Sequence, residues 1–459
     1  MEKRTEKDSL GPVEVPQEAY FGASTQRAVD NFPVSGLQLP ASFLKTLALI
    51  KLMAARVNRD LGLLDESVAE AIETACQEIM EGQLADQFPV DVFQTGSGTS
   101  TNMNLNEVIA SRANEILTGK KGGRSPVHPN DHVNLGQSSN DVIPTALHVS
   151  AVVDVKDGLV PVLEQLAMAL REKSLAFAEI RKIGRTHLQD AVPIKLGDEF
   201  AGYTCQAQKS VARATNITHE LAELPLGGTA VGNGLNTHPE FARKVIAHLA
   251  EHTGFPFKEA RNHFEAQGAR DAAVAASGLL KTIAVSLSKI ANDIRWLGSG
   301  PRSGLGEIRL PAVQPGSSIM PGKVNPVIPE AVIQAAVQVM GNDTVVTLAG
   351  KGGHFELNAM LPVMIHNLHQ SIRLLTGAAD IFTQRCIRGI EADSEKCLGT
   401  IANSLALATY LVPDLGYDKS AEIAHRAYAE DKTIEVVLRE EGLLSPERID
   451  VLFGPFHSK

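Results

Sequence analysis

The chain carries the stretch GSSIMPGKVNP at residues 316–326, which brings two hydroxyls, a lysine, a carboxamide and two glycines together. The glycines can adopt backbone angles that other residues avoid, so that a ligand can approach the main chain. Pro326 suits the first turn of a helix, where free N–H groups favour an anion. The stretch predicts a loop that leads into a helix and holds a carboxylate through Lys323 and Asn325. The alternative is an ordinary polar surface loop.

The bulk composition is that of a soluble globular protein. The 459 residues are enough for a large core and two or three domains, with 44% hydrophobic and 21% charged residues. The net charge of −10 leaves no basic surplus for general nucleic-acid binding, although it allows a small anionic substrate. The first ten residues show no signal segment and no uninterrupted apolar run reaches membrane-spanning length, so we expect a cytoplasmic protein. We expect four reduced, buried thiols: Cys76, Cys205, Cys386 and Cys397.

Apolar spacing predicts a mainly helical chain. Residues 1–40 are rich in proline, glycine and polar residues and indicate an irregular arm. Helices are predicted over 41–61 and 66–81, with Gly62 as a C-terminal stop and Asp65 as an N-cap. Between 141 and 390, apolar residues recur at three-four spacing, which is typical of long helices packed in a bundle. These stripes favour core or subunit contacts over a cofactor site, and we expect an oligomer. The clearest stripes are Leu159-Leu163-Leu166-Leu170, Leu280-Ile283-Leu287-Ile290-Ile294 and Leu361-Ile365-Leu368-Ile372-Leu375.

Two hydroxyl-rich loops precede helical stretches. TGSGT at 95–99 either cradles an anion or caps a helix, and it lacks the Gly-Lys-Ser/Thr of a nucleotide-binding loop. GQSSND at 136–141 places Ser139, Asn140 or Asp141 as a helix cap. Capping and anion binding can coexist at a helix N-terminus.

Three further loops carry histidine or glycine. His187 in GRTHLQD at 184–190 stands alone, and a lone histidine is more often structural than catalytic. The glycines of 226–237 lack the spacing of a dinucleotide fingerprint, which excludes NAD binding there. His128 and His132 are four residues apart, but Pro129 and Asn130 disfavour a helix and no further ligand completes a metal site. We therefore expect no metal.

The stretch at 316–326 resembles the signature loop of the fumarase/aspartase superfamily, G-S-S-x-M-P-x-K-x-N-P. TGSGT, SSND and the FELN segment at 355–358 resemble other elements of that family, so that the likeness covers nearly the whole chain. It implies a mainly α, three-domain fold with a long central helical bundle. The expected domains are 1–137, 138–393 and 394–459. It also implies a homotetramer in which three subunits build each active site.

The resemblance further implies roles for individual residues. Ser317 would abstract a proton, and His187 would act on the leaving-group side through water, oriented by Glu330. Serine is a poor base in water, and only a nearby cation and N–H donors could favour its alkoxide; Glu330 could instead be simply a favourable first-turn acid. Substrate contacts would come from Ser97, Thr99, Ser138, Ser139, Asn140, Thr186, Ser318, Lys323 and Asn325. A candidate second anion site would contain His128, Asn130 and Asp131.

The details favour one branch of the family. THLQD with His187 resembles class II fumarases, where aspartases usually carry glutamine, whereas VIPE at 327–330 resembles the aspartase form. Because the former residues belong to the site, the leading hypothesis is reversible hydration of fumarate to malate through an aci-carboxylate intermediate, without metal or organic cofactor. The alternative is an aspartate ammonia-lyase. A helical scaffold without chemistry is disfavoured, because the polar residues of the expected site are all present.

Overall fold

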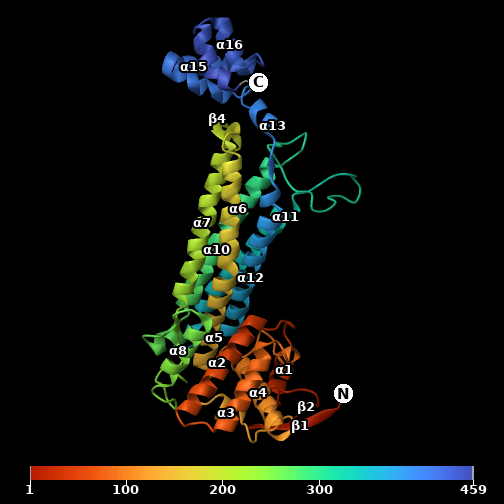
Figure 1. Ribbon diagram of the computed structural model, residues 1–459, viewed down its shortest axis with the longest axis vertical. Coiled ribbons are helices and arrows are strands. Elements are labelled where there is room, and N and C mark those ends of the chain that lie inside the picture. The colour runs from red at the N-terminus through yellow and green to blue at the C-terminus, as the bar shows by residue number, and fades with distance from the viewer. Residues whose placement is uncertain (1, 457–459) are drawn as a thin grey trace. The chain divides into compact units, whose positions relative to one another are not determined.

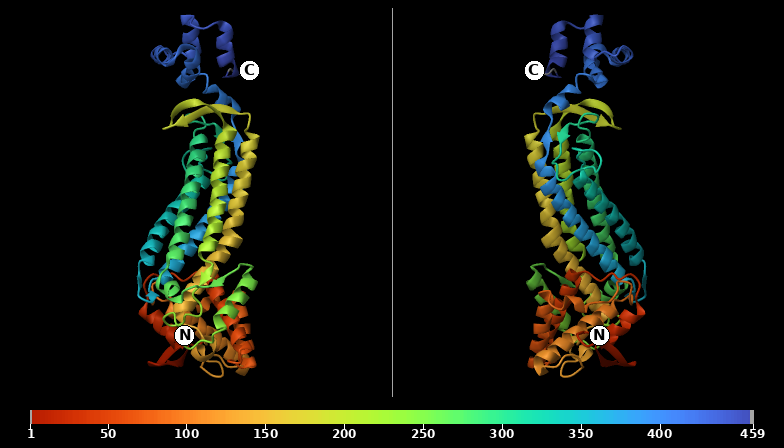
Figure 2. Two further views of the ribbon diagram at one scale, coloured as in Figure 1. Left: turned by 90° about the vertical axis from the view of Figure 1, so that its left-hand side faces the viewer. Right: turned by 90° about the vertical axis from the view of Figure 1, so that its right-hand side faces the viewer.

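The computed structural model describes residues 2–456, and the chain forms two compact units (Figures 1 and 2). Unit 1 comprises the chain up to Pro161 together with Ala212–Ala284 and Ala336–Thr376. Unit 2 comprises Val162–Val211, Val285–Ala335 and the chain from Gly377 onward. Each unit is therefore assembled from segments that lie far apart in the sequence.

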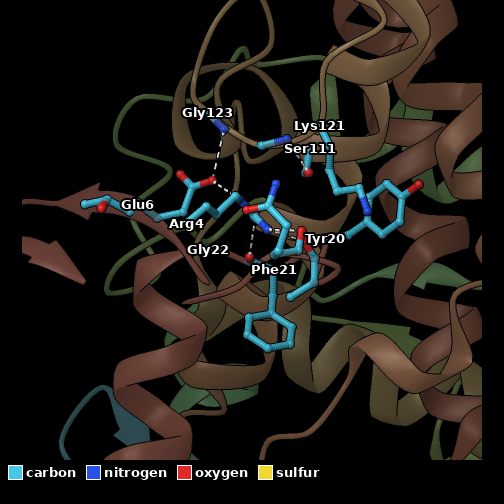
Figure 3. A network of polar contacts seen from close by, with 12 residues as sticks. Arg4, Glu6, Tyr20, Phe21, Gly22, Ser111, Lys121 and Gly123 are labelled. Carbon is cyan, nitrogen blue, oxygen red and sulfur yellow. Dashed lines mark hydrogen bonds and ion pairs between the residues drawn. The ribbon is translucent and has the colours of Figure 1, made fainter. Parts of the chain in front are cut away.

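The N-terminal arm is more regular than its composition predicts. Strand β1 (Lys3–Asp8) pairs antiparallel with β2 (Gly11–Pro16), and helix α1 (Ala23–Asn31) follows. The side chain of Arg4 donates hydrogen bonds to four main-chain oxygens between Pro16 and Phe21 and pairs with Glu6 at 2.9 Å (Figure 3). Glu6 also accepts a hydrogen bond from Gly123 N at 3.2 Å. The expectation of an irregular arm is thus wrong, because one partly buried arginine organises the polar segment.

The helices expected next are present in unit 1. Helix α2 (Ala41–Asp60) ends at a left-handed Gly62, and α3 (Glu66–Met80) begins after Asp65, whose side chain makes no capping hydrogen bond. The other helices of this region are α4 (Thr99–Thr118), α5 (Ser139–Val153), α8 (Phe241–Thr253) and α9 (His263–Gly268). Short elements are η1 (Ala85–Gln87), η2 (Pro129–Val133), η3 (Asp154–Leu159), the parallel pair β5 (Glu223–Leu224) and β6 (Lys258–Glu259), and the hairpin β8 (Gly353–His354) and β9 (Leu357–Asn358).

Several long helices contribute a segment to each unit, and within a unit these segments lie side by side (Figures 1 and 2). They are α6 (Val160–Ala176), α7 (Leu196–Glu220), α10 (Asp271–Leu297), α11 (Val327–Gly350) and α12 (Leu361–Arg385). The three apolar stripes are buried, which confirms the predicted bundle. A Cβ on Gly350 would lie 2.5 Å from Val274, so small residues do allow α10 and α11 to approach closely.

Unit 2 also holds the hairpin β3 (Arg181–Thr186) and β4 (Gln189–Lys195), and the pair β7 (Ile308–Arg309) and β10 (Glu391–Ala392). The short helical segments expected after residue 390 enclose a small core that includes Leu411, Ile423, Leu438 and Phe453. These segments are α13 (Ser394–Gly399), η5 (Leu405–Leu411), α14 (Val412–Leu415), α15 (Tyr417–Ala429), α16 (Ile434–Glu441), α17 (Pro446–Phe453) and η6 (Gly454–Phe456), and η4 (Ile387–Gly389) precedes them.

One expectation from composition needs correction. Cys205 is exposed, whereas the other three cysteines are buried. Helix α10 is long and apolar enough to cross a membrane by length and composition alone, although Lys281 and Lys289 interrupt its apolar sequence. Half of its most apolar window is buried inside the protein, as in a core helix of a soluble protein.

Candidate functional site

The predicted site residues fall into two groups, one in each unit. In unit 2, residues 316–326 form an exposed loop closed by hydrogen bonds from Gly316 N to Lys323 O (2.8 Å) and from Asn325 Nδ2 to Gly316 O (2.6 Å). A Cβ on Gly316 would lie 2.6 Å from Lys323 O, so glycine is needed for the loop to close. Gly322 has φ +79°, which glycine tolerates best. The sequence-based expectation of a glycine-dependent loop before a helix is confirmed.

The hydroxyl of Ser317 is held by main-chain donors. Its Oγ accepts hydrogen bonds from Ile319 N (3.2 Å) and Met320 N (3.0 Å). Two N–H groups directed at one oxygen stabilise negative charge on it, which is the condition for serine to act as a base. Lys323, an exposed cation, belongs to the same loop. Glu330 lies in the first turn of α11, as predicted, and is half-buried.

His187 lies at the tip of the β3–β4 hairpin rather than in an irregular loop. His187 and Leu188 form its two-residue turn, with φ of 56° and 59°. Non-glycine residues adopt this region rarely, and such strain is concentrated at functional sites. Both residues are exposed, as are Thr186 before them and Ser318 in the 316–326 loop. Their side chains are therefore available to a ligand or to another subunit.

A hollow of about 440 Å³ in unit 2 adjoins the hairpin. His187 and Arg185 line it from the hairpin, and Glu199, Tyr203 and Asp293 line it from the helices. Burial raises the pKa of Glu199, and the nearby charge of Lys182 cancels only part of that effect. Burial also raises the pKa of Tyr203, whose hydroxyl donates to Asp293 at 3.0 Å. The hollow thus places an imidazole beside ionisable groups.

In unit 1, the first turns of α4 and α5 lie against each other. Ser97 Oγ and Thr99 Oγ1 are 2.7 Å apart at the start of α4. Asn102 Nδ2 donates to Ser139 Oγ at 3.0 Å and so joins the two helix starts. Two helix N-termini side by side favour a negatively charged group more than either does alone. Ser97, Thr99 and Ser139, which are predicted to contact the substrate, are thus brought together within this unit.

The cap of α5 is Ser138, not one of the three residues after it. Ser138 Oγ accepts from Asn140 N (3.2 Å), and Asp141 Oδ1 accepts from Ser138 N (2.9 Å), forming a capping box. The other oxygen of Asp141 accepts from Gly227 N (3.1 Å) and Thr229 N (2.9 Å). Asp141 therefore fastens the 226–237 glycine segment to the helix start, a role that the sequence did not predict.

A buried lysine was also missed. Lys51 of α2 is fully buried, and its Nζ donates to Asn134 Oδ1 at 2.9 Å. Asn102 and Asn106 donate to the same oxygen, at 3.1 and 3.2 Å. Burial lowers the pKa of Lys51 to about 7 and raises that of Asp141 to about 6, while their opposite charges partly offset both shifts. Nothing in the helical stripe of α2 distinguishes this lysine from a surface residue.

The candidate second anion site has a defined geometry. Residues Pro129–Val133 form one π-helical turn, although proline and asparagine led us to expect no helix. His128 Nδ1 accepts from Asn130 N (3.2 Å) and Asp131 N (3.1 Å). Burial lowers the pKa of His128, which favours the neutral imidazole. His132 Nδ1 accepts from His128 N at 2.9 Å, so these two rings serve the turn and do not converge on a metal.

Among residues 2–456, no three side chains of histidine, cysteine, aspartate or glutamate lie together in a way that could hold a metal ion. The prediction of a reaction without metal remains a prediction.

Comparison with known proteins agrees with this architecture. Residues 11–341 match the lyase family, and residues 407–457 match the fumarase C C-terminus family. Fumarate hydratase class II of Nitrosomonas europaea is 54% identical over 452 residues, covering 98% of each chain. The protein of that name from Thermosynechococcus vestitus is 52% identical, covering 97% of this chain and 96% of its own. The crystal structure of class II fumarase from Schistosoma mansoni matches with a TM-score of 0.96 and 40% identity, covering 99% and 98% of the two chains.

The helical bundle, the hydroxyl-lined helix starts and the 316–326 loop therefore define an enzyme of the lyase type. Within that type, the chain belongs to the class II fumarate hydratase family. The fold and the family expected from the signature loop are both confirmed.

Proposed function

We propose that this protein catalyses the reversible addition of water to fumarate, giving malate. The proposal is supported by relatives of that name that are similar over nearly the whole chain. The structural observation that carries it is the hydroxyl of Ser317, which accepts two main-chain N–H hydrogen bonds in a loop that also holds Lys323. Such a hydroxyl can give up its proton more readily than a free serine.

The chemistry assigns a role to each group. In the dehydration direction, Ser317, as its alkoxide, takes a proton from the carbon beside one carboxylate, which then carries extra charge as an aci-carboxylate. Lys323 and Asn325 stabilise that charge as fixed donors. The hydroxyl leaves as water after receiving a proton on the His187 side, where Glu330 orients the histidine. Base and acid then act at the two ends of the bond that becomes double.

The unit 1 residues hold the other end of the substrate. The adjoining N-termini of α4 and α5 provide N–H groups and hydroxyls suited to a carboxylate. The residues assigned to substrate contacts here are Ser97, Thr99, Ser138, Ser139 and Asn140, and those of unit 2 are Thr186 and Ser318. His128, Asn130 and Asp131 are proposed as a second anion site, where the His128 N–H not used by the turn would donate.

We also propose a cytoplasmic homotetramer with shared active sites. The exposure of His187, Leu188, Thr186 and Lys323 supports this, because a site that stabilises an aci-carboxylate must be shielded from bulk solvent and these residues lie open in the single chain. The division into domains at residues 138 and 394 remains a proposal, since each compact unit draws on several segments.

Proton NMR of fumarate incubated with the purified protein tests the function directly. Malate signals are expected in buffer free of ammonium. The rival function, an aspartate ammonia-lyase, is favoured by the VIPE segment at 327–330 and predicts aspartate only when ammonium is added. Absence of malate under both conditions would overturn the proposed hydration.

A further inference from the structure

The turn that carries His187 needs an anchor outside itself. His187 and Leu188 both have positive φ, and both are exposed. Packing of their own side chains therefore does not hold the turn in this conformation. Strained backbone persists where the surrounding structure determines it. The strands below the turn must therefore fix its direction.

Strand β3 reaches a buried carboxylate at two points. Lys182 Nζ lies 3.1 Å from Glu307 Oε2, and Arg185 Nη2 lies 2.7 Å from Glu307 Oε1. Residues three apart on a flat strand point to opposite faces. The pairing register, however, shifts by one residue between Ile183 and Arg185, and such a bulge increases the local twist. A Cβ on Gly184 would lie 2.8 Å from Val192 O, so glycine is needed at this bulge.

The carboxylate of Glu307 is itself fixed. Its side chain is fully buried, and its main chain donates to Leu297 O (2.9 Å) and accepts from Asp393 N (2.9 Å). Lys182 is also fully buried and donates to Glu199 at 2.7 Å. Two cations and two carboxylates thus balance one another, and the loss of Glu307 would leave Lys182 and Arg185 with one carboxylate between them.

We propose that Glu307 is a positioning residue, which acts through Arg185 and Lys182 to set the direction of the His187 imidazole. This inference rests on the proposed function, in which His187 serves the leaving-group side. Arg185 is two residues from His187 and lines the same hollow. A shift of Arg185 that follows a change at Glu307 would therefore reach His187 through only two residues of main chain. The predicted carboxylate ligands Lys323 and Asn325 belong to a different loop.

The first test is the kinetics of Glu307→Gln, which keeps the size and one acceptor oxygen but removes the charge. We expect kcat to fall about 10- to 100-fold, because a shift of about 1 Å in a catalytic group costs that much. KM for fumarate should change by less than about threefold. Lys195→Gln is the matched control: it lies on β4 of the same hairpin, in an ion pair with the largely exposed Glu179, and should leave kcat unchanged.

A double-mutant cycle separates positioning from general stability. If Glu307 acts through His187, Glu307→Gln should lower kcat no further in a His187→Gln background. The positioning role would be overturned if Glu307→Gln lowered kcat by the same factor in the wild-type and His187→Gln backgrounds. A wild-type kcat in the Glu307→Gln single variant would overturn it as well. If Glu307→Gln does not fold, Arg185→Gln takes its place in the cycle with the same expectations. A wild-type protein that does not hydrate fumarate would overturn the proposed function instead, before the cycle is begun.

Discussion

At the scale of the residue, the proposed chemistry depends on how nearby hydrogen-bond donors change the reactivity of ordinary side chains. Ser317 differs from a surface serine through two N–H groups directed at its Oγ. Sequence alone identified Ser317 through its surrounding motif, but not these hydrogen bonds. It missed Lys51 altogether and gave Asp141 only as a candidate helix cap, because the burial of both residues depends on segments that are distant in the chain.

Replacing Ser317 with alanine should lower kcat about 10²- to 10⁴-fold, the range expected for a lost proton-transfer group. Assembly and melting temperature should be unchanged, because among residues 2–456 the Ser317 side chain bonds only to N–H groups of its own exposed loop. Steady-state kinetics with fumarate checks the rate, with Ser303→Ala, an exposed serine in unit 2, as control. Near-normal turnover in Ser317→Ala would remove Ser317 from the mechanism.

The buried Lys51 should make stability depend on pH. Its folded pKa of about 7 lies below its ordinary value of 10.5, so the folded state loses the proton first as pH rises. The contribution of Lys51 to stability should then increase from pH 7 toward 10.5, by up to about 1.4 kcal/mol per pH unit, and should level off below pH 7, where both states hold the proton. In Lys51→Met this slope should disappear. Chemical unfolding at several pH values checks it, and an unchanged slope in the variant would show that Lys51 is not its source.

At the scale of the element, periodicity predicted the long helices well because each buries a continuous apolar stripe. It failed for short elements held by tertiary contacts. Strand β1 has an almost entirely polar sequence and depends on Arg4. The turn at His187 and Leu188 lacks the glycine or asparagine that usually marks a hairpin of this type, so it was expected as a loop.

The loop before α4 should tolerate no side chain at Gly96. A Cβ there would lie 1.8 Å from Ala359 O, so the main chain would have to move. We expect Gly96→Ala to lower the free energy of unfolding by about 2–4 kcal/mol, in the range of strong overpacking, and to raise KM. Gly119→Ala at the other end of α4 is the control: its φ is +71° but its Cβ would meet nothing within 4 Å, so it should cost only about 1 kcal/mol. Equal losses in both variants would argue against close approach as the cause.

At the scale of the whole molecule, the predicted site residues are divided between two compact units, and several of them lie open in the single chain. The signature loop was sufficient to predict the family and the helical bundle. The signature loop could not predict the buried ion network around Glu307, because that network joins residues more than a hundred positions apart.

Shared active sites predict complementation between inactive variants. If three subunits contribute to each site, mixed tetramers of Ser317→Ala and Asn140→Ala should contain some sites with neither substitution. Refolding the two proteins together should then restore activity well above the sum of the separate samples. Light scattering should show a tetramer in each case. A mixture no more active than its parts would indicate that each chain builds its own site.

The most direct measurement is the initial rate of loss of fumarate absorbance with purified protein, with and without ammonium. Hydration predicts the same rate in both conditions. Loss that occurs only with ammonium would contradict this account, and would show that the VIPE segment at 327–330 was a better guide to the reaction than His187.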